Sequence, residues 1–108
     1  MKANGLVLEK TDTGWIETYV ELKGITDILS VLGTDMKGIT QVNIDRYRKI
    51  FYSNKNLEKY GSISAMIDVN EERWYMVAPL LLVECNDIEP IILSKKVENE
   101  IKDKITLY

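Results

Sequence analysis

Residues 74–84 read WYMVAPLLLVE and give the strongest strand signal in the chain. It is a nearly continuous apolar run that ends at Glu84, which is typical of a strand buried on both faces at the centre of a sheet. Proline has no backbone N–H to donate to a β-ladder. We therefore expect Pro79 to lie at a bulge or to break the run in two.

Further strands are predicted on both sides of this stretch from alternating apolar residues and from β-branched and aromatic residues. They are expected over residues 5–9, 15–22, 39–44, 49–52 and 89–93, with a weaker segment over 63–69. Residues 11–14 and 53–56 are rich in Asp, Asn, Gly, Ser and Thr, which is typical of turns. Asn86 and Asp87 are expected to turn the chain into the last short strand.

Apolar residues at helical spacing predict two helices. The first has its apolar stripe at Ile25, Ile28, Leu29 and Leu32, with Thr26 as the expected N-cap and Gly33 as the residue that ends it. The second begins after the N-cap Ser94 and has its stripe at Val97, Ile101 and Ile105.

The resulting order of elements predicts one α+β domain over residues 1–108. We expect a small antiparallel β-sheet, with a short central helix and a C-terminal helix packed on one face. Strand order is not predicted. The shared core is expected to contain Ile28, Leu29, Leu32, Leu81, Val83, Val97, Ile101 and Ile105.

The composition excludes several classes of function. Among its 108 residues the chain has no histidine and one cysteine, Cys85, which rules out Ser-His and Cys-His nucleophiles, Cys/His zinc sites and an internal disulfide. The glycines fit no phosphate-loop spacing. We therefore expect no catalytic residues, no cofactor and no metal. No segment resembles a membrane span or a signal peptide, so we expect a cytoplasmic protein.

Several landmarks together are similar to a known family. They are the segments ITDILSVLGTDMKGI, VNIDRYRKIFYSNKNLEKYG, SISAMID, WYMVAPLLLVECND and PIILSKKVENEI. In this order they resemble a family of small phage- and plasmid-borne proteins known only as a domain of unknown function. The chain departs from that family at Ala78-Pro79, where a Gly is usual, and at the start of the last helix. The resemblance implies an accessory protein of a mobile genetic element and supplies no catalytic residues.

The sharpest local feature is the charge of residues 46–60, where five basic residues and one acid give +4 in a chain whose net charge is −3. Aromatic residues interleave with these charges, a pattern that suits phosphate contacts and base stacking. The alternative is a solvated hairpin whose aromatic side chains alternate into the core. Together with Trp74, a possible exposed anchor, the candidate partner-binding residues are Arg46, Arg48, Lys49, Tyr52, Lys55, Lys59, Tyr60 and Trp74.

Other polar features point to structure rather than chemistry. Glu71 and Glu72, and Asp87 and Glu89, are interpreted as solvated acids, and Cys85 as a small buried hydrophobe.

The favoured function is a non-enzymatic binding protein of a mobile element, which acts by protein–protein contact, for example by blocking a host defence protein. The alternative is a small-ligand or nucleic-acid-binding module that uses residues 46–60. A homodimer formed through unpaired sheet edges is also expected.

Overall fold

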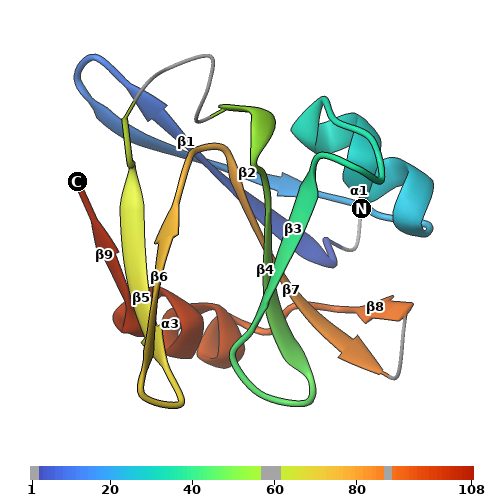
Figure 1. The fold of residues 1–108 in the computed structure, drawn as a ribbon. Helices are drawn as coiled ribbons and strands as arrows, with labels where there is room; N and C mark the ends of the chain where they lie inside the picture. Colours follow the sequence, from blue (N-terminus) through green and yellow to red (C-terminus); the bar gives the residue numbers. More distant parts are fainter. Residues whose placement is uncertain (1–2, 57–61, 87–88) are drawn as a thin grey trace.

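The computed structural model describes residues 3–56, 62–86 and 89–108, and it confirms the α+β class. In chain order the elements are β1 (Gly5–Thr11), β2 (Gly14–Val20), α1 (Ile25–Leu32), β3 (Ile39–Asn43), β4 (Arg48–Ser53), β5 (Ala65–Val69), β6 (Glu72–Met76), β7 (Leu80–Asn86), β8 (Glu89–Ile91), α3 (Lys95–Lys104) and β9 (Ile105–Leu107) (Figure 1). Each expected strand is present, and all pairings between them are antiparallel in the described part of the chain.

The apolar run of residues 74–84 supplies the central strand, as expected. β7 lies in the middle of a sheet with the order β2-β1-β7-β4-β3, called here the large sheet, and β8 also pairs with β7. The first four side chains of β7 have no exposed surface. Pro79 breaks the run in two, because the residues before it form β6, which belongs to a different sheet.

The second sheet, called here the small sheet, has the order β6-β5-β9. The sequence does not predict β9, since Ile105 fits the apolar stripe of the last helix. In the structure that helix ends at Lys104, Ile105 is extended, and residues 105–107 pair with β5. Ile105 and Thr106 are β-branched and favour a strand where an unpaired edge is available.

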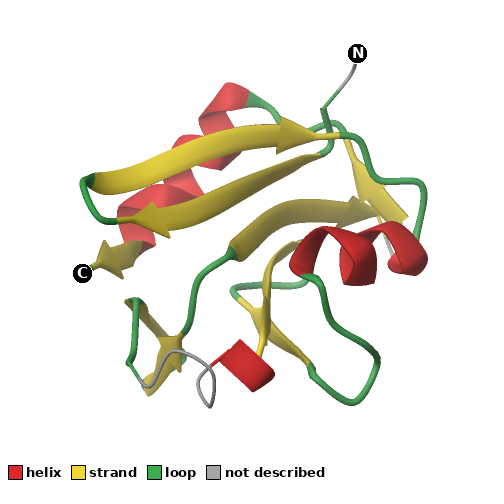
Figure 2. Ribbon diagram, turned by 90° about the horizontal axis from the view of Figure 1, so that it is seen from above, coloured by secondary structure: helices red, strands yellow, loops and turns green. Residues whose placement is uncertain are grey.

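The large sheet separates two buried clusters, so the helices do not share one core (Figure 2). Leu82 packs with Val97 and Ile101 of α3 and with the small sheet. Leu81 packs on the opposite face with Ile28 and Leu32 of α1. The expectation that both helices lie on one face is therefore wrong, and so is the single shared core. Neighbouring residues of a strand point to opposite faces, and both faces of β7 are covered.

The helix ends are set by local residues. The Ser94 side chain accepts a hydrogen bond from the Val97 N–H, which confirms this N-cap. Gly33 ends α1 in the left-handed conformation, also as expected. The N-cap of α1 is Gly24 rather than Thr26, so no side chain caps its first turn.

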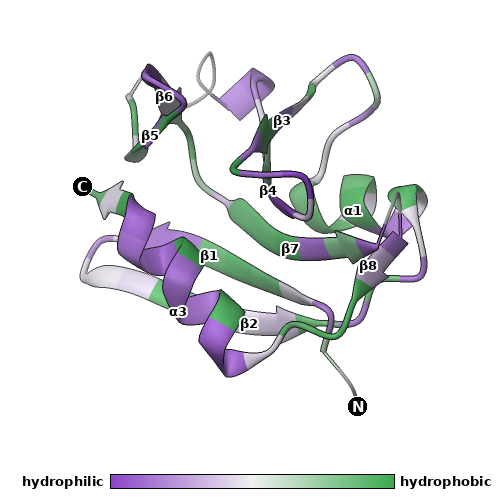
Figure 3. Ribbon diagram, turned by 90° about the horizontal axis from the view of Figure 1, so that it is seen from below, coloured by the Kyte–Doolittle hydropathy of each residue, from purple (hydrophilic) through white to green (hydrophobic). Residues whose placement is uncertain are grey.

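α3 is hydrophilic over most of its length, with short apolar segments (Figure 3). Val97 and Ile101 form its apolar stripe and pack into the cluster between the two sheets. Among the described residues no helix has the length and apolar character needed to cross a membrane.

Candidate functional site

The turn between β3 and β4 is held by the side chain of Asp45. Its Oδ1 accepts hydrogen bonds from the N–H groups of Tyr47 (2.8 Å) and Arg48 (2.9 Å). The Tyr47 carbonyl in turn accepts a 2.6 Å hydrogen bond from the Cys85 N–H of β7. This turn is therefore tied to the central strand, and we call its outer residues, Arg46 and Tyr47, the hairpin tip.

The hairpin tip presents a cation and an aromatic ring together. The Arg46 guanidinium carbon lies 5.5 Å from the centroid of the Tyr47 ring, within the range of a cation–π interaction. Arg46 is exposed, and 48% of the Tyr47 surface is exposed. No ion pair with a described residue involves Arg46. Tyr47 is one of the aromatic residues interleaved with the basic charges, but the sequence does not place it among the candidate partner-binding residues, although tyrosine is enriched among residues that dominate binding energy.

The Arg48 side chain lies on the side of the hairpin opposite to the hairpin tip, where acidic side chains surround it. Its Nη1 is 2.7 Å from Glu100 of α3, and its Nε is 3.9 Å from Glu84 of β7 and 3.8 Å from Asp45. Only 27% of its side-chain surface is exposed. Arg48 thus connects β4, β7 and α3, and its charge is neutralised within the chain.

Lys55 is also paired within the chain. Its Nζ is 2.8 Å from Asp35, and this hydrogen bond holds the pKa of the Asp35 carboxyl below its usual value. Lys59 and Tyr60 lie outside the described residues. The positive charge of residues 46–60 therefore does not form one patch among the residues that the structure describes.

Two aromatic candidates face the core. Tyr52 is buried at 8% exposure in the cluster between the sheets, and burial raises the pKa of its hydroxyl. Trp74 is half-buried against the same cluster. Phe51, the neighbour of Tyr52, is buried on the other face of the large sheet. Tyr52 and Phe51 of β4 thus alternate into the two cores, whereas Tyr47 in the turn is exposed.

Lys49 faces the α1 side of the large sheet, opposite to Arg48. It lines a pocket of about 370 Å³ between α1, β3, β4, β7 and β8. The residues lining this pocket, called here the α1 pocket, are Lys23, Gly24, Ile25, Ile28, Gln41, Lys49, Phe51, Cys85, Glu89 and Pro90. The sequence did not predict this site, because its walls come from segments that only the fold brings together.

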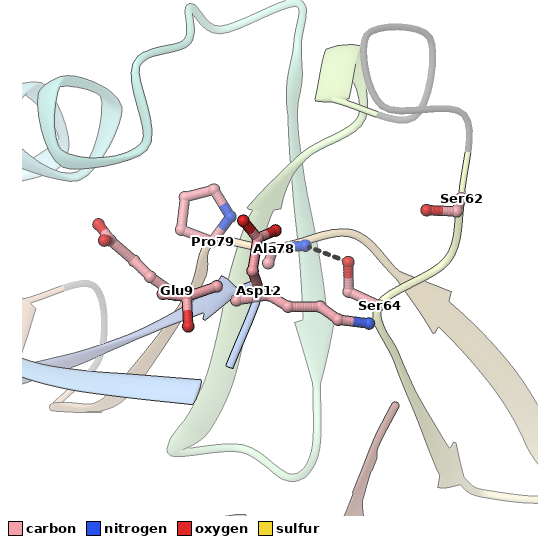
Figure 4. A pocket seen from close by; sticks show the side chains of 8 residues that line it. Glu9, Asp12, Ser62, Ser64, Ala78 and Pro79 are labelled. Atoms are coloured by element: carbon pink, nitrogen blue, oxygen red, sulfur yellow. Dashed lines mark hydrogen bonds between the residues drawn. The ribbon is translucent and has the colours of Figure 1, made fainter. Parts of the chain in front are cut away.

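A second pocket, of about 610 Å³, lies beside the β1–β2 turn (Figure 4). Glu9 and Asp12 line one part of it, and Ser64 and Pro79 another. The Ser64 side chain is already used in the fold, since its Oγ accepts a 3.1 Å hydrogen bond from the Ala78 N–H.

Cys85 and the acidic residues singled out from the sequence form no further site among the described residues. Cys85 is 3% exposed, which confirms that it is a small buried residue. Glu71 and Glu72 are exposed at the β5–β6 turn. Asp87 lies outside the described residues. Among the described residues no group of acidic or cysteine side chains has an arrangement that would hold a metal ion.

Comparison with known proteins gives no relative: no family model, no curated protein and no solved structure matches this chain.

Proposed function

We propose that this chain is a non-enzymatic binding protein of the cytoplasm, and that it docks through the hairpin tip onto an acidic surface of a protein partner. The observation that carries this proposal is the exposed Arg46–Tyr47 pair on a turn fixed by Asp45. Arginine and tyrosine are enriched among the residues that dominate binding energy. A turn that is already rigid also loses little conformational entropy when it binds.

A protein partner is favoured over a nucleic acid by the distribution of charge. Arg48 and Lys55 are paired with acids of the same chain, and Lys49 faces α1 rather than the hairpin tip. An arginine that forms no ion pair within the described part of the chain and lies beside an aromatic ring suits a local acidic patch, whereas nucleic-acid binding relies on many phosphate contacts. The chain as a whole is acidic, with a net charge of −3. The resemblance to mobile-element proteins supports a host defence protein as the partner.

Photo-cross-linking in the native host tests this proposal. A photoreactive phenylalanine analogue replaces Tyr47 in one sample and Tyr75 of β6 in a matched control. Tyr75 is 52% exposed, and its neighbour Arg73 is paired with Asp68 at 2.9 Å, so this second site offers the same residue types without the free charge. We expect one protein to be cross-linked at fixed stoichiometry from position 47 and not from position 75.

The charge reversal Arg46→Glu completes the test. It should slow association with the captured protein, because attraction between opposite charges accelerates encounter. Equal cross-linking from positions 47 and 75 would contradict the proposal. Cross-linking to a second copy of this chain would favour the homodimer instead, and co-purified nucleic acid would favour the alternative function.

A further inference from the structure

The α1 pocket has an apolar floor that the fold leaves open at one side. Ile28, Phe51 and Cys85 form this floor, with 4%, 6% and 3% of their surfaces exposed. Ile28 comes from α1, while Phe51 and Cys85 come from the adjacent strands β4 and β7. A volume of about 370 Å³ is in the range of small-molecule sites, which combine a mostly apolar lining with a few polar groups.

The polar groups of the α1 pocket carry a net positive charge. Lys23 precedes α1, Lys49 comes from β4, and Glu89 comes from β8. Among the described residues that line the pocket, two lysines and one glutamate leave one positive charge. Neither lysine forms an ion pair with any residue in the described ranges.

The start of α1 contributes charges of both signs, because its exposed N–H groups are positive and an acid, Asp27, lies in its first turn. Gly24, which lines the pocket, is the N-cap of α1, and no side chain caps the first turn. The unpaired N–H groups of a first turn and the helix dipole favour an anion nearby. Asp27, whose Oδ2 accepts a 2.8 Å hydrogen bond from the Lys23 N–H, offsets this potential, so the attraction for an anion rests on the Lys23 and Lys49 side chains.

We propose that the α1 pocket binds a small organic anion with a flat apolar body and a single negative charge, of the aromatic carboxylate class. The apolar body lies on Ile28, Phe51 and Cys85, and the carboxylate faces Lys23 and Lys49. One net positive charge at the pocket matches a monoanion, and Glu89 disfavours a second negative charge on the ligand. This site uses a face of the hairpin different from the hairpin tip, so it does not rest on the proposed docking function.

The test is an NMR titration with three probes of equal size. 2-Naphthoate is the anion, 2-naphthamide its neutral counterpart and 2-naphthylmethylamine the cation. We expect 2-naphthoate to bind roughly tenfold more tightly than the amide, and the amine not to bind. Amide shifts should be confined to the surroundings of Ile28, Phe51 and Cys85 and should spare Trp74.

Four variants separate recognition of the ligand's charge from non-specific apolar binding. Lys49→Gln and Lys23→Gln should each remove most of the preference for 2-naphthoate over the amide. Lys37→Gln, an exposed lysine outside the pocket, is the matched control and should keep it. Gly24→Asp should abolish 2-naphthoate binding while leaving the Tm unchanged or slightly raised. Its backbone is extended, a Cβ there meets no atom within 4 Å, and aspartate is a good N-cap.

Several outcomes would overturn the proposal. They are equal affinity for all three probes, shifts centred on another part of the molecule, no binding of 2-naphthoate up to about 1 mM, or loss of preference in Lys37→Gln as well. 2-Naphthyl phosphate is a fourth probe in the titration. Tighter binding of this dianion than of 2-naphthoate would reassign the site to phosphate esters.

Discussion

The Tyr19 hydroxyl donates a 2.7 Å hydrogen bond to Oε1 of Glu98, across 79 residues of sequence. Glu98 is 1% exposed, and its carboxylate also meets the ammonium groups of Lys95 (3.3 Å) and Lys102 (3.5 Å). The Lys102 Nζ also lies 2.6 Å from Oε1 of Glu17 in β2. These contacts fasten α3 to β2, the edge strand of the large sheet.

Removal of the Tyr19–Glu98 hydrogen bond should destabilise the fold. Tyr19→Phe should lower the free energy of unfolding by about 1.5–3 kcal/mol, the usual worth of a hydrogen bond to a charged group. Urea unfolding followed by circular dichroism measures this change. Tyr47→Phe is the control, because that exposed hydroxyl should matter by less than about 0.5 kcal/mol. Equal losses for the two variants would contradict a special role for Tyr19.

Glu98 should also make stability depend on pH. Burial acts to raise the pKa of its carboxyl, but the hydrogen bonds and charges of Tyr19, Lys95 and Lys102 outweigh burial and lower it. An unfolded glutamate has a pKa of about 4.3. The stability that ionised Glu98 contributes is therefore complete above that value, and it is lost as the pH falls toward the lower folded pKa.

Unfolding of the wild type and of Glu98→Gln between pH 7 and pH 3 measures this effect. The wild type should be the more stable protein at pH 7, and the difference should shrink as the pH falls below about 4.3. A difference that stays constant over this range would show that Glu98 does not keep a lowered pKa in the folded state.

Two neighbouring leucines should report on the two separate cores. Leu81 and Leu82 have no exposed surface and lie in different clusters. Leu81→Ala and Leu82→Ala should each cost about 2–5 kcal/mol. Because the clusters lie on opposite faces, Leu81→Ala should loosen α1, and Leu82→Ala should loosen α3. Hydrogen exchange of the two helices measures this difference, and uniform loosening in both variants would contradict separate cores.

Local sequence signals predict most helices and strands correctly. They do not predict how elements that are far apart in the sequence pack against one another. Residues 74–84 identified the central strand, and Ser94 the start of α3, because both depend on nearby residues. The central strand is buried on both faces, and the sequence does not show which face each helix covers. The prediction therefore put α1 and α3 on the same face of the sheet. Ile105 was misassigned because its edge partner β5 lies about 40 residues away.

The same limit applies to the candidate site. The alternation of side chains along a strand correctly predicts that Arg48 and Lys49 lie on opposite faces and that Phe51 and Tyr52 are buried, but it does not predict the exposed Tyr47. The acid that neutralises Arg48 is Glu100, which follows it by more than fifty residues. No local sequence pattern predicts such a pair. The net charge of +4 over residues 46–60 therefore suggests a more basic surface than the folded protein has.

Arg48 should behave as a structural residue and Arg46 as a surface residue. Arg48→Ala should lower the free energy of unfolding by about 1 kcal/mol, whereas Arg46→Ala should change it by less than about 0.5 kcal/mol. Neither the wild type nor either variant should bind single- or double-stranded DNA or RNA below about 1 µM at low salt. Tight, salt-sensitive binding to any of these would promote the nucleic-acid alternative over the protein partner.

Cys85 gives a direct readout of the charges around the α1 pocket. Burial raises the pKa of its thiol, Lys49 opposes that shift, and Glu84 adds to it. Alkylation by neutral iodoacetamide requires the thiolate, so the midpoint of its pH–rate profile should lie above the ordinary thiol pKa of about 8.5. Because Cys85 is the only cysteine, a single mass increment measures the rate at this site.

Two substitutions should move this pH–rate profile in opposite directions. Lys49→Gln removes a cation that stabilises the thiolate, so the midpoint should shift to higher pH. Glu84→Gln removes an anion that destabilises it, so the midpoint should shift to lower pH. A change in access alone would alter the plateau rate of both variants and leave the midpoints in place. Shifts in the same direction, or no shift in either variant, would contradict electrostatic control of Cys85 by these two residues.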